Sequence, residues 1–167
     1  MVQLWVNLPA KDKMSTPKYQ AITNDQIPKI EVGNEVGLVE VIAGNYDGNP
    51  GAASTYSPVH LYNAKLKENG EASFSFPAHY NTALLVIEGA VLINGIEDVP
   101  LDHFALFSNK GEDFTIKATE QSIVLILSGE PIRETIAAHG PFVMNTRSEI
   151  LQAFEDYENG KFGNLED

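Results

Sequence analysis

Short apolar runs separated by turn residues fill the middle of the chain, over residues 83–118. The runs are too short for helices, and Asn94-Gly95 between apolar flanks is a strong signal for a β-hairpin. Apolar and polar residues alternate in the later runs, as they do along a half-buried strand. We predict four strands here: Ala83–Glu88, Ala90–Ile93, Leu101–Phe107 and Phe114–Lys117. Antiparallel strands at this spacing predict a sandwich or a small barrel.

Similar runs on both sides of this stretch predict further strands. They are Val2–Asn7, a piece within Ile22–Ile30, Gly37–Ala43, His60–Leu66, Ala72–Phe76 and Ser122–Leu127. The last of them is continuously apolar, which suits a strand that is covered on both faces. Gly44–Pro58 is rich in Gly, Asn, Ser and Pro, and we predict that it is a long loop.

The pattern changes after residue 128. Residues 129–146 are interrupted by two prolines and two glycines, and we predict that they are irregular. Thr146 and Glu149 then match a capping box, which predicts a helix over about residues 148–159. The apolar stripe of this helix would be Ile150, Leu151, Phe154 and Tyr157, and its water-facing side would be Gln152, Glu155 and Asp156.

Charge and composition narrow the classes of function. Lys plus Arg count 11 against 23 Asp plus Glu, and the resulting formal charge of -12 disfavours nucleic acid and anionic membranes as partners. The absence of Cys excludes disulfides, thiolate catalysis and Cys-type zinc sites. The N-terminus lacks the pattern of a signal peptide, and no window approaches a membrane span. These features predict a cytoplasmic protein.

Two stretches resemble the C-terminal half of pirin-type proteins: QLWVNLPAKDKMSTPKYQ and GEPIRETIAAHGPFVMNTRSEILQAFEDYENGKFG. In that family two cupin barrels share one chain, and the likeness here spans nearly the whole sequence without the first barrel. The resemblance implies a single cupin, a jelly roll or double-stranded β-helix. We therefore predict one all-β domain over residues 1–167, with a β-barrel over about 1–128 and a short C-terminal α-helix.

The resemblance also implies where a metal would bind. The family's iron lies in the first barrel, held by three His and one Glu. A metal-binding cupin generally shows a Gly, two His one residue apart, a Glu three or four residues later, and a fourth ligand on a later strand. Laid on this chain from Gly70, that spacing falls on Phe76, Ala78, about Thr82 and near Phe114. Phenyl rings supply bulk rather than metal donors, so we expect a filled barrel with no metal or other cofactor.

The four His residues, at positions 60, 79, 103 and 139, show no metal-ligand spacing. His103 shares a strand face with apolar residues, so it would point into the barrel as a catalytic residue or as a hydrogen-bonded core residue. His79 beside Tyr80 would lie at the barrel mouth, either as an acid–base pair or as an exposed loop residue. The loop at His139 is expected to set backbone shape.

Three interpretations of function remain open. The first is a metal-free scaffold or binding module that acts through protein association or a small-molecule ligand, as a homodimer or with a metal-bearing cupin partner. Its interface candidates are Leu4, Trp5, Ile132, Phe142 and Val143, although Trp5 could equally be core. The second is an iron-dependent dioxygenase, since the family is known for oxidation of flavonols such as quercetin. The third is that the chain is a fragment of a two-barrel protein.

Overall fold

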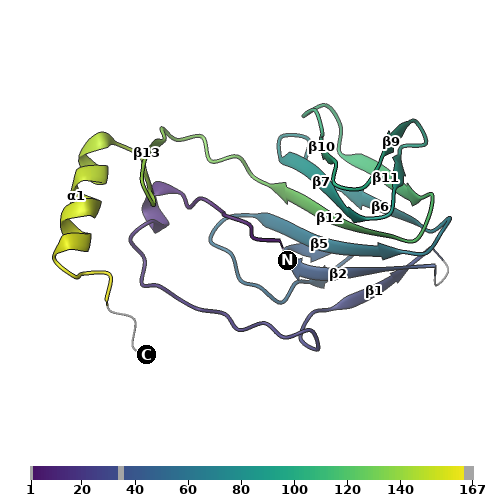
Figure 1. Cartoon of the computed structure of the whole chain (residues 1–167), viewed down its shortest axis with the longest axis horizontal. Helices are drawn as coiled ribbons and strands as arrows, with labels where there is room; N and C mark the ends of the chain where they lie inside the picture. The colour runs from purple at the N-terminus through teal and green to yellow at the C-terminus, as the bar shows by residue number, and fades with distance from the viewer. Residues whose placement is uncertain (1, 34–35, 164–167) are drawn as a thin grey trace. The chain divides into compact units, whose positions relative to one another are not determined.

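The computed structural model describes residues 2–33 and 36–163, and the chain divides into two compact units. One unit combines Met1–Pro17 with Ile132–Asp167, and the other is Lys18–Pro131. The second unit contains both large sheets, whereas the first contains the C-terminal helix (Figure 1). Among the described residues, no helix is both long enough and apolar enough to cross a membrane.

The larger sheet has six antiparallel strands in the order β1-β2-β5-β12-β7-β10. Their bounds are β1 (Lys29–Val32), β2 (Gly37–Ala43), β5 (Val59–Leu66), β12 (Ser122–Gly129), β7 (Asn81–Glu88) and β10 (Phe104–Leu106). The strands predicted over 37–43, 60–66, 83–88 and 122–127 are therefore confirmed. The continuously apolar β12 lies between β5 and β7 (Figure 1), so its two edges are both paired.

The smaller sheet has four antiparallel strands in the order β6-β11-β8-β9. Their bounds are β6 (Glu71–Ser75), β11 (Asp113–Ala118), β8 (Val91–Ile93) and β9 (Glu97–Val99). The predicted hairpin at Asn94-Gly95 joins β8 to β9, and both of its residues have positive φ angles, of 52° and 69°. A short hairpin of β3 (Asn45–Tyr46) and β4 (Asn49–Pro50) lies within the loop that was predicted over residues 44–58.

The two large sheets pack face to face around one apolar core. The six-stranded sheet contributes Val39, Val41, Tyr62, Leu84, Val124 and Ile126, and the four-stranded sheet contributes Phe74, Val91, Phe114 and Ile116. The predicted all-β class with one C-terminal helix is confirmed. Within the part of this unit that the structure describes, the two large sheets share no hydrogen-bonded strand pair, so it is an open sandwich of jelly-roll type rather than a continuously bonded barrel.

Several predicted elements differ from the structure. Residues 2–7 form no strand, although their side chains alternate in character. The piece predicted within residues 22–30 begins only at Lys29, and β9 was missed. The strand predicted over 101–107 shortens to β10, because the chain turns before it: His103 N donates to Pro100 O at 3.2 Å, and Asp102 has a positive φ.

The segment predicted to be irregular contains a hairpin. Strands β13 (Ala137–His139) and β14 (Phe142–Met144) pair antiparallel around Gly140, which has a φ of 56°. Helix α1 (Arg147–Glu158) follows, and its predicted capping box is confirmed. The Thr146 hydroxyl accepts from Glu149 N at 3.3 Å, and the Glu149 carboxylate accepts from Thr146 N at 2.7 Å.

Candidate functional site

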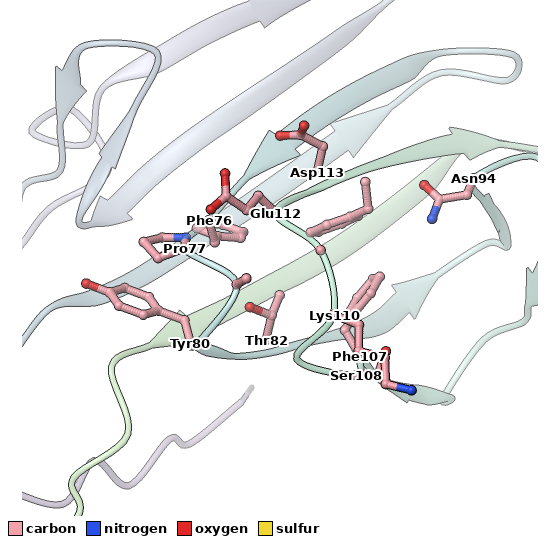
Figure 2. Close-up of a pocket in the computed structure, with 13 residues that line it drawn as sticks. Phe76, Pro77, Tyr80, Thr82, Asn94, Phe107, Ser108, Lys110, Glu112 and Asp113 are labelled. Atoms are coloured by element: carbon pink, nitrogen blue, oxygen red, sulfur yellow. The ribbon is translucent and has the colours of Figure 1, made fainter.

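A pocket of about 160 Å³ opens where the ends of β6, β7 and β11 meet the loop that follows β10 (Figure 2). Its lining residues are Phe76, Pro77, Ala78, Tyr80, Thr82, Asn94, Phe107, Ser108, Lys110, Gly111, Glu112, Asp113 and Phe114. The rim is polar, with Lys110, Glu112 and Asp113 exposed to solvent. The floor is mainly aromatic, so the pocket offers ring faces below and hydrogen-bonding groups above.

The four positions at which the metal-ligand spacing falls all line this pocket. We call them the four lining positions: Phe76, Ala78, Thr82 and Phe114. Two sets of backbone contacts bring them together. β6 pairs with β11 so that Phe74 lies opposite Phe114, and Phe76 N donates to Glu112 O at 2.9 Å. Phe107 N donates to Thr82 O at 3.0 Å, which joins β7 to the loop. That these positions match the metal ligands of relatives stays a prediction.

Aromatic side chains fill the floor of the pocket. Phe76 and Phe114 are only 4% and 5% exposed. The ring centroid of Phe114 lies 4.3 Å from that of Phe107 and 5.3 Å from that of Phe74. Rings at these separations pack as tilted or offset pairs that exclude water. The floor is therefore part of the hydrophobic core.

An iron centre of the kind that the family holds in its first barrel does not fit the four lining positions. Such a centre needs three or four nitrogen or oxygen donors that converge on one point. Of the four lining positions only Thr82 has a side-chain oxygen, and its buried hydroxyl is already hydrogen-bonded to the Ser128 hydroxyl at 2.8 Å. In the described ranges 2–33 and 36–163, no group of three or more His, Cys, Asp or Glu could hold a metal ion.

His79 and Tyr80 lie next to each other, but only Tyr80 lines the pocket. Their rings meet edge to face at 4.9 Å, and His79 is exposed. Burial, with a smaller effect of the Glu130 carboxylate, raises the pKa of Tyr80. Tyr80 therefore stays protonated at neutral pH and can donate a hydrogen bond to a ligand.

His103 does not point into the barrel, contrary to the prediction. Its side chain is exposed, and its Nδ1 lies 2.9 Å from Leu101 O. The reason is the turn before β10, which leaves His103 outside the strand, whereas Ala105 on β10 and Phe107 just after it pack on the core. His139 is also exposed, and its ring lies 5.6 Å from that of Phe154.

His60 is the histidine that the sequence reasoning missed. It lies on β5, half-buried, with its ring centroid 5.1 Å from that of Phe76 and 6.1 Å from that of Tyr80. Its Nδ1 lies 2.8 Å from the hydroxyl of Tyr62, which donates to Asn45 O. The same Nδ1 accepts a hydrogen bond from Asn45 N at 3.4 Å. The signal in the sequence was the spacing of His60 and Tyr62, which places both on one strand face.

Burial lowers the pKa of His60 below its ordinary value. The folded protein therefore binds this proton less readily than the unfolded chain does. The stability due to neutral His60 is complete above a pH of about 6.5 and is lost as the pH falls from there toward the lower folded-state pKa. We expect His60→Gln to flatten the dependence of unfolding free energy on pH across this range, measured by urea denaturation. His79→Gln, at an exposed position, is the control and should leave the curve unchanged. An equal effect of the two variants would contradict the attribution of this pH dependence to His60.

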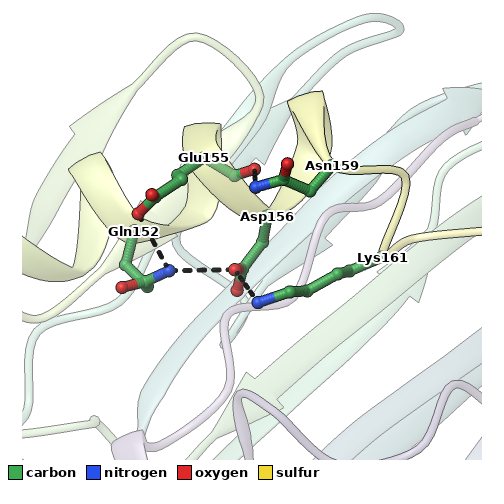
Figure 3. Close-up of polar contacts among 5 residues, drawn as sticks. All are labelled: Gln152, Glu155, Asp156, Asn159 and Lys161. Atoms are coloured by element: carbon green, nitrogen blue, oxygen red, sulfur yellow. Dashed lines mark hydrogen bonds and ion pairs between the residues drawn. The ribbon is translucent and has the colours of Figure 1, made fainter.

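Helix α1 buries only part of the predicted stripe: Ile150 is 6% exposed and Phe154 is half-buried. Leu151 and Tyr157 are 64% and 65% exposed, whereas Asp156 is only 8% exposed. Figure 3 shows the reason: the Asp156 carboxylate accepts from Lys161 Nζ at 2.7 Å and from Gln152 Nε2 at 2.9 Å. These hydrogen bonds, with that from Lys161 the stronger, lower the pKa of Asp156 and compensate for the water that it loses.

The predicted interface candidates divide into two groups. Leu4, Trp5 and Val143 are 45%, 75% and 40% exposed. Ile132 and Phe142 are half-buried, and the Phe142 ring lies 5.0 Å from that of Phe154 on α1. Phe142 therefore packs within its own unit, and three of the five candidates remain as large exposed apolar side chains.

Comparison with known proteins identifies clear relatives. Residues 61–163 match the family model described as "Pirin C-terminal cupin domain". The chain is 40% identical over 162 residues to the "Putative quercetin 2,3-dioxygenase" PA2418 of Pseudomonas aeruginosa, covering 97% of this chain and 56% of that protein. It is 34% identical over 167 residues to "Pirin" of Homo sapiens, covering 97% of this chain and 57% of that protein.

A solved structure of quercetin 2,3-dioxygenase from Acinetobacter baumannii superposes with a TM-score of 0.90 at 39% sequence identity, over 97% of this chain and 56% of that one. The resemblance to pirin-type proteins and the predicted cupin fold are therefore confirmed. The chain spans little more than half the length of the relatives that it matches.

Proposed function

Because the chain belongs to the pirin family, as its C-terminal cupin domain, we propose that it is a metal-independent binding module. In this proposal the pocket holds a small molecule, and exposed apolar side chains bind a protein partner. It combines the two modes of action that the sequence predicted for a metal-free cupin, namely protein association and binding of a small-molecule ligand.

The donor set of the pocket is the observation that supports this function. Three of the four lining positions have no side-chain oxygen or nitrogen, and the fourth, Thr82, is hydrogen-bonded to Ser128. Pockets for drug-sized ligands span roughly 300–1,000 Å³, so a pocket of about 160 Å³ suits a molecule much smaller than a three-ring flavonol. Tyr80 and the rim would supply its hydrogen bonds, and the Phe floor would contact its apolar side.

Association with protein is the second part of the proposal. Leu4, Trp5 and Val143 are exposed in the unit that combines the two ends of the chain. Large exposed apolar side chains are typical of surfaces that bind another protein. We propose a homodimer or a metal-bearing cupin as the partner.

A dioxygenase is the alternative function. It is favoured by the 39% identity to the quercetin 2,3-dioxygenase of Acinetobacter baumannii. That activity belongs to a protein of which this chain covers only 56%, and the four lining positions do not supply a metal site. The alternative therefore requires donors other than these positions.

Metal analysis and turnover decide between the two functions. We expect elemental analysis of freshly purified protein to find far less than one iron, nickel, copper or manganese per chain. We also expect no consumption of quercetin or O₂ after incubation with each ion. The quercetin 2,3-dioxygenase from Acinetobacter baumannii, treated identically, is the positive control. Stoichiometric metal with turnover, lost in His79→Ala or His103→Ala, would establish the alternative.

A further inference from the structure

The pocket at the ends of β6, β7 and β11 matches one aromatic ring in size. Its volume is about 160 Å³. An apolar cavity of about 150 Å³ that was engineered into another protein, lined by Leu, Ile and Phe, binds benzene. Pockets for drug-sized ligands, which have several rings, begin at roughly 300 Å³. Size therefore limits the part of a ligand that this pocket can enclose to about one ring.

Three phenyl side chains form the walls against which such a ring would lie. Phe76 and Phe114 are nearly fully buried, and Phe107, on the loop that follows β10, is half-buried. The ring centroid of Phe114 lies 4.3 Å from that of Phe107 and 6.2 Å from that of Phe76, and both pairs are tilted. Aromatic rings attract one another in offset or edge-to-face pairs, beyond the effect of buried area alone. These walls therefore favour an aromatic ligand over an aliphatic ligand of the same size.

Backbone hydrogen bonds hold the walls in place without a ligand. Phe76 N donates to Glu112 O at 2.9 Å, and Phe107 N donates to Thr82 O at 3.0 Å. Phe114 lies on β11, which pairs with β6 at one edge and with β8 at the other. A preformed pocket loses little conformational entropy when a ligand binds, so even a small molecule can bind measurably.

Two uncharged hydrogen-bond donors lie at the rim. Figure 2 shows Tyr80 and Asn94 at opposite ends of the pocket. The Oδ1 of Asn94 accepts from Thr115 N at 2.9 Å, which orients the amide and leaves its Nδ2 to donate to a ligand. The Tyr80 hydroxyl also remains a donor at neutral pH, since burial raises its pKa further above neutrality. Both groups can therefore donate a hydrogen bond to an oxygen atom of a ligand.

The charged groups of the rim select against an anion. Lys110 carries one positive charge, whereas Glu112 and Asp113 carry two negative charges. The chain as a whole has a net charge of -12. A carboxylate ligand would therefore be repelled by the rim and by the rest of the protein. Any charged ligand would also lose water of hydration against the phenyl walls, which is costly. A neutral ligand avoids both penalties.

We propose that the pocket binds a neutral aromatic molecule of a single ring that carries a hydroxyl or carbonyl oxygen. The inference rests on the small-molecule pocket of the proposed function and names its class of ligand. The ring lies against Phe76, Phe107 and Phe114, and the oxygen accepts a hydrogen bond from Tyr80 or Asn94. Phenol is the simplest member of this class and the first probe.

Four probes test size, aromaticity and charge separately. Titration of isotope-labelled protein, followed by the amide signals in NMR spectra, gives each dissociation constant and locates the site. We expect phenol to bind with a Kd of about 1 mM or below and to shift the signals of Phe76, Thr82 and Phe114. Cyclohexanol should bind at least about 3-fold more weakly, because its ring is not aromatic. Naphthol should bind no more tightly than phenol, since the pocket cannot enclose its second ring, and benzoate should bind more weakly.

A variant without the two rim donors tests the role of the oxygen. It combines Tyr80→Phe with Asn94→Asp, which keeps an acceptor for Thr115 N. We expect this variant to bind phenol about 3-fold more weakly or worse, because a hydrogen bond is lost. Toluene, which has a methyl group in place of the hydroxyl, should weaken by less than about 2-fold. Tyr56→Phe is the matched control, since that side chain is 52% exposed and does not line the pocket.

A second variant, Ala78→Leu, tests the location of the ring. Ala78 lines the pocket and is half-buried on the loop after β6, so the larger side chain fills space without interrupting a strand. Phenol and toluene should both bind roughly 10-fold more weakly or worse. Circular dichroism verifies that each variant keeps the wild-type fold.

The outcomes separate this inference from the proposed function. No binding of phenol, tighter binding of naphthol or benzoate, equal binding of cyclohexanol, or binding that survives Ala78→Leu overturns the inference. Equal weakening of phenol and toluene in the donor variant also overturns it, because the oxygen would then make no contact. In each case where another probe binds, the pocket remains a small-molecule site and the proposed function stands. Stoichiometric metal with turnover overturns the proposed function itself, whatever these probes do.

Discussion

Replacement of Phe114 by alanine is expected to lower the free energy of unfolding by about 3–5 kcal/mol, the range for large-to-small changes of buried Phe. Phe114 is 5% exposed and packs against Phe107 and Phe74 at ring-centroid distances of 4.3 and 5.3 Å. Phe74 lies on β6, which pairs with β11, and Phe107 N donates to Thr82 O at 3.0 Å, so both neighbours are held in place and resist collapse into the space that the ring leaves. The loss therefore combines the transfer free energy of the ring with the cost of a cavity beneath the pocket.

Urea denaturation followed by far-UV circular dichroism measures this change, because the single Trp lies outside the two-sheet unit. Tyr19→Ala is the control: the side chain is 90% exposed, and its loss should alter stability by less than about 0.5 kcal/mol. A change below about 1 kcal/mol for Phe114→Ala would show that the pocket floor is loosely packed. The proposal that packed Phe rings replace a cavity lined by metal donors would then lose its basis.

Local pattern was sufficient to predict the elements that pair along their whole length. β2, β5 and β12 alternate or run apolar because each packs one or both faces on neighbours. The capping box was equally readable, since its two hydrogen bonds join residues three apart. A strand also needs a hydrogen-bonding partner, which no local pattern supplies. Residues 2–7 alternate without forming a strand, whereas β13 and β14 pair within a Pro- and Gly-rich stretch.

The pocket was predictable in part. Spacing and resemblance selected four lining positions that the strand register does bring together. The prediction for His103 failed because one turn before β10 changed the direction of the side chain. The helix stripe was right for Ile150 and wrong for Asp156, because a carboxylate can be buried once Lys161 pairs with it. The spacing of His60 and Tyr62 showed only that they share a strand face, whereas Asn45, which contacts both, is 15 residues from His60 in the sequence. Such groupings depend on packing and not on spacing along the chain.

Introducing metal ligands at the four lining positions is expected to create a metal site. The variant combines Phe76→His, Ala78→His, Thr82→Glu and Phe114→His. If these positions match the ligands of metal-binding cupins, three imidazoles and one carboxylate will converge in the pocket, the donor set that suits divalent iron or nickel. We expect affinity for Ni²⁺ to increase at least about 1,000-fold over wild type, or roughly 4 kcal/mol. Isothermal titration and ligand-field absorption of the bound ion measure it.

The variant loses two core rings and the Thr82–Ser128 hydrogen bond, so its metal-free form will be less stable. This loss makes folding itself a readout, because an ion that binds only the folded state stabilises it by about 2.7 kcal/mol at 100 times its dissociation constant. Ni²⁺ should therefore raise the melting temperature of this variant and leave the wild type unchanged. The control has Asn at the three His positions and Gln at position 82, which keep similar bulk but bind metals weakly.

A grafted variant that folds and binds no more Ni²⁺ than this control would show that the four lining positions are not the metal positions of relatives. The register of the resemblance would then have to move by one residue, toward His79, which is exposed and does not line the pocket. A gain of binding would instead mean that the backbone of this domain can still hold a metal site. The identity of the side chains at Phe76, Ala78, Thr82 and Phe114 would then explain why the wild-type chain has no metal site at these positions.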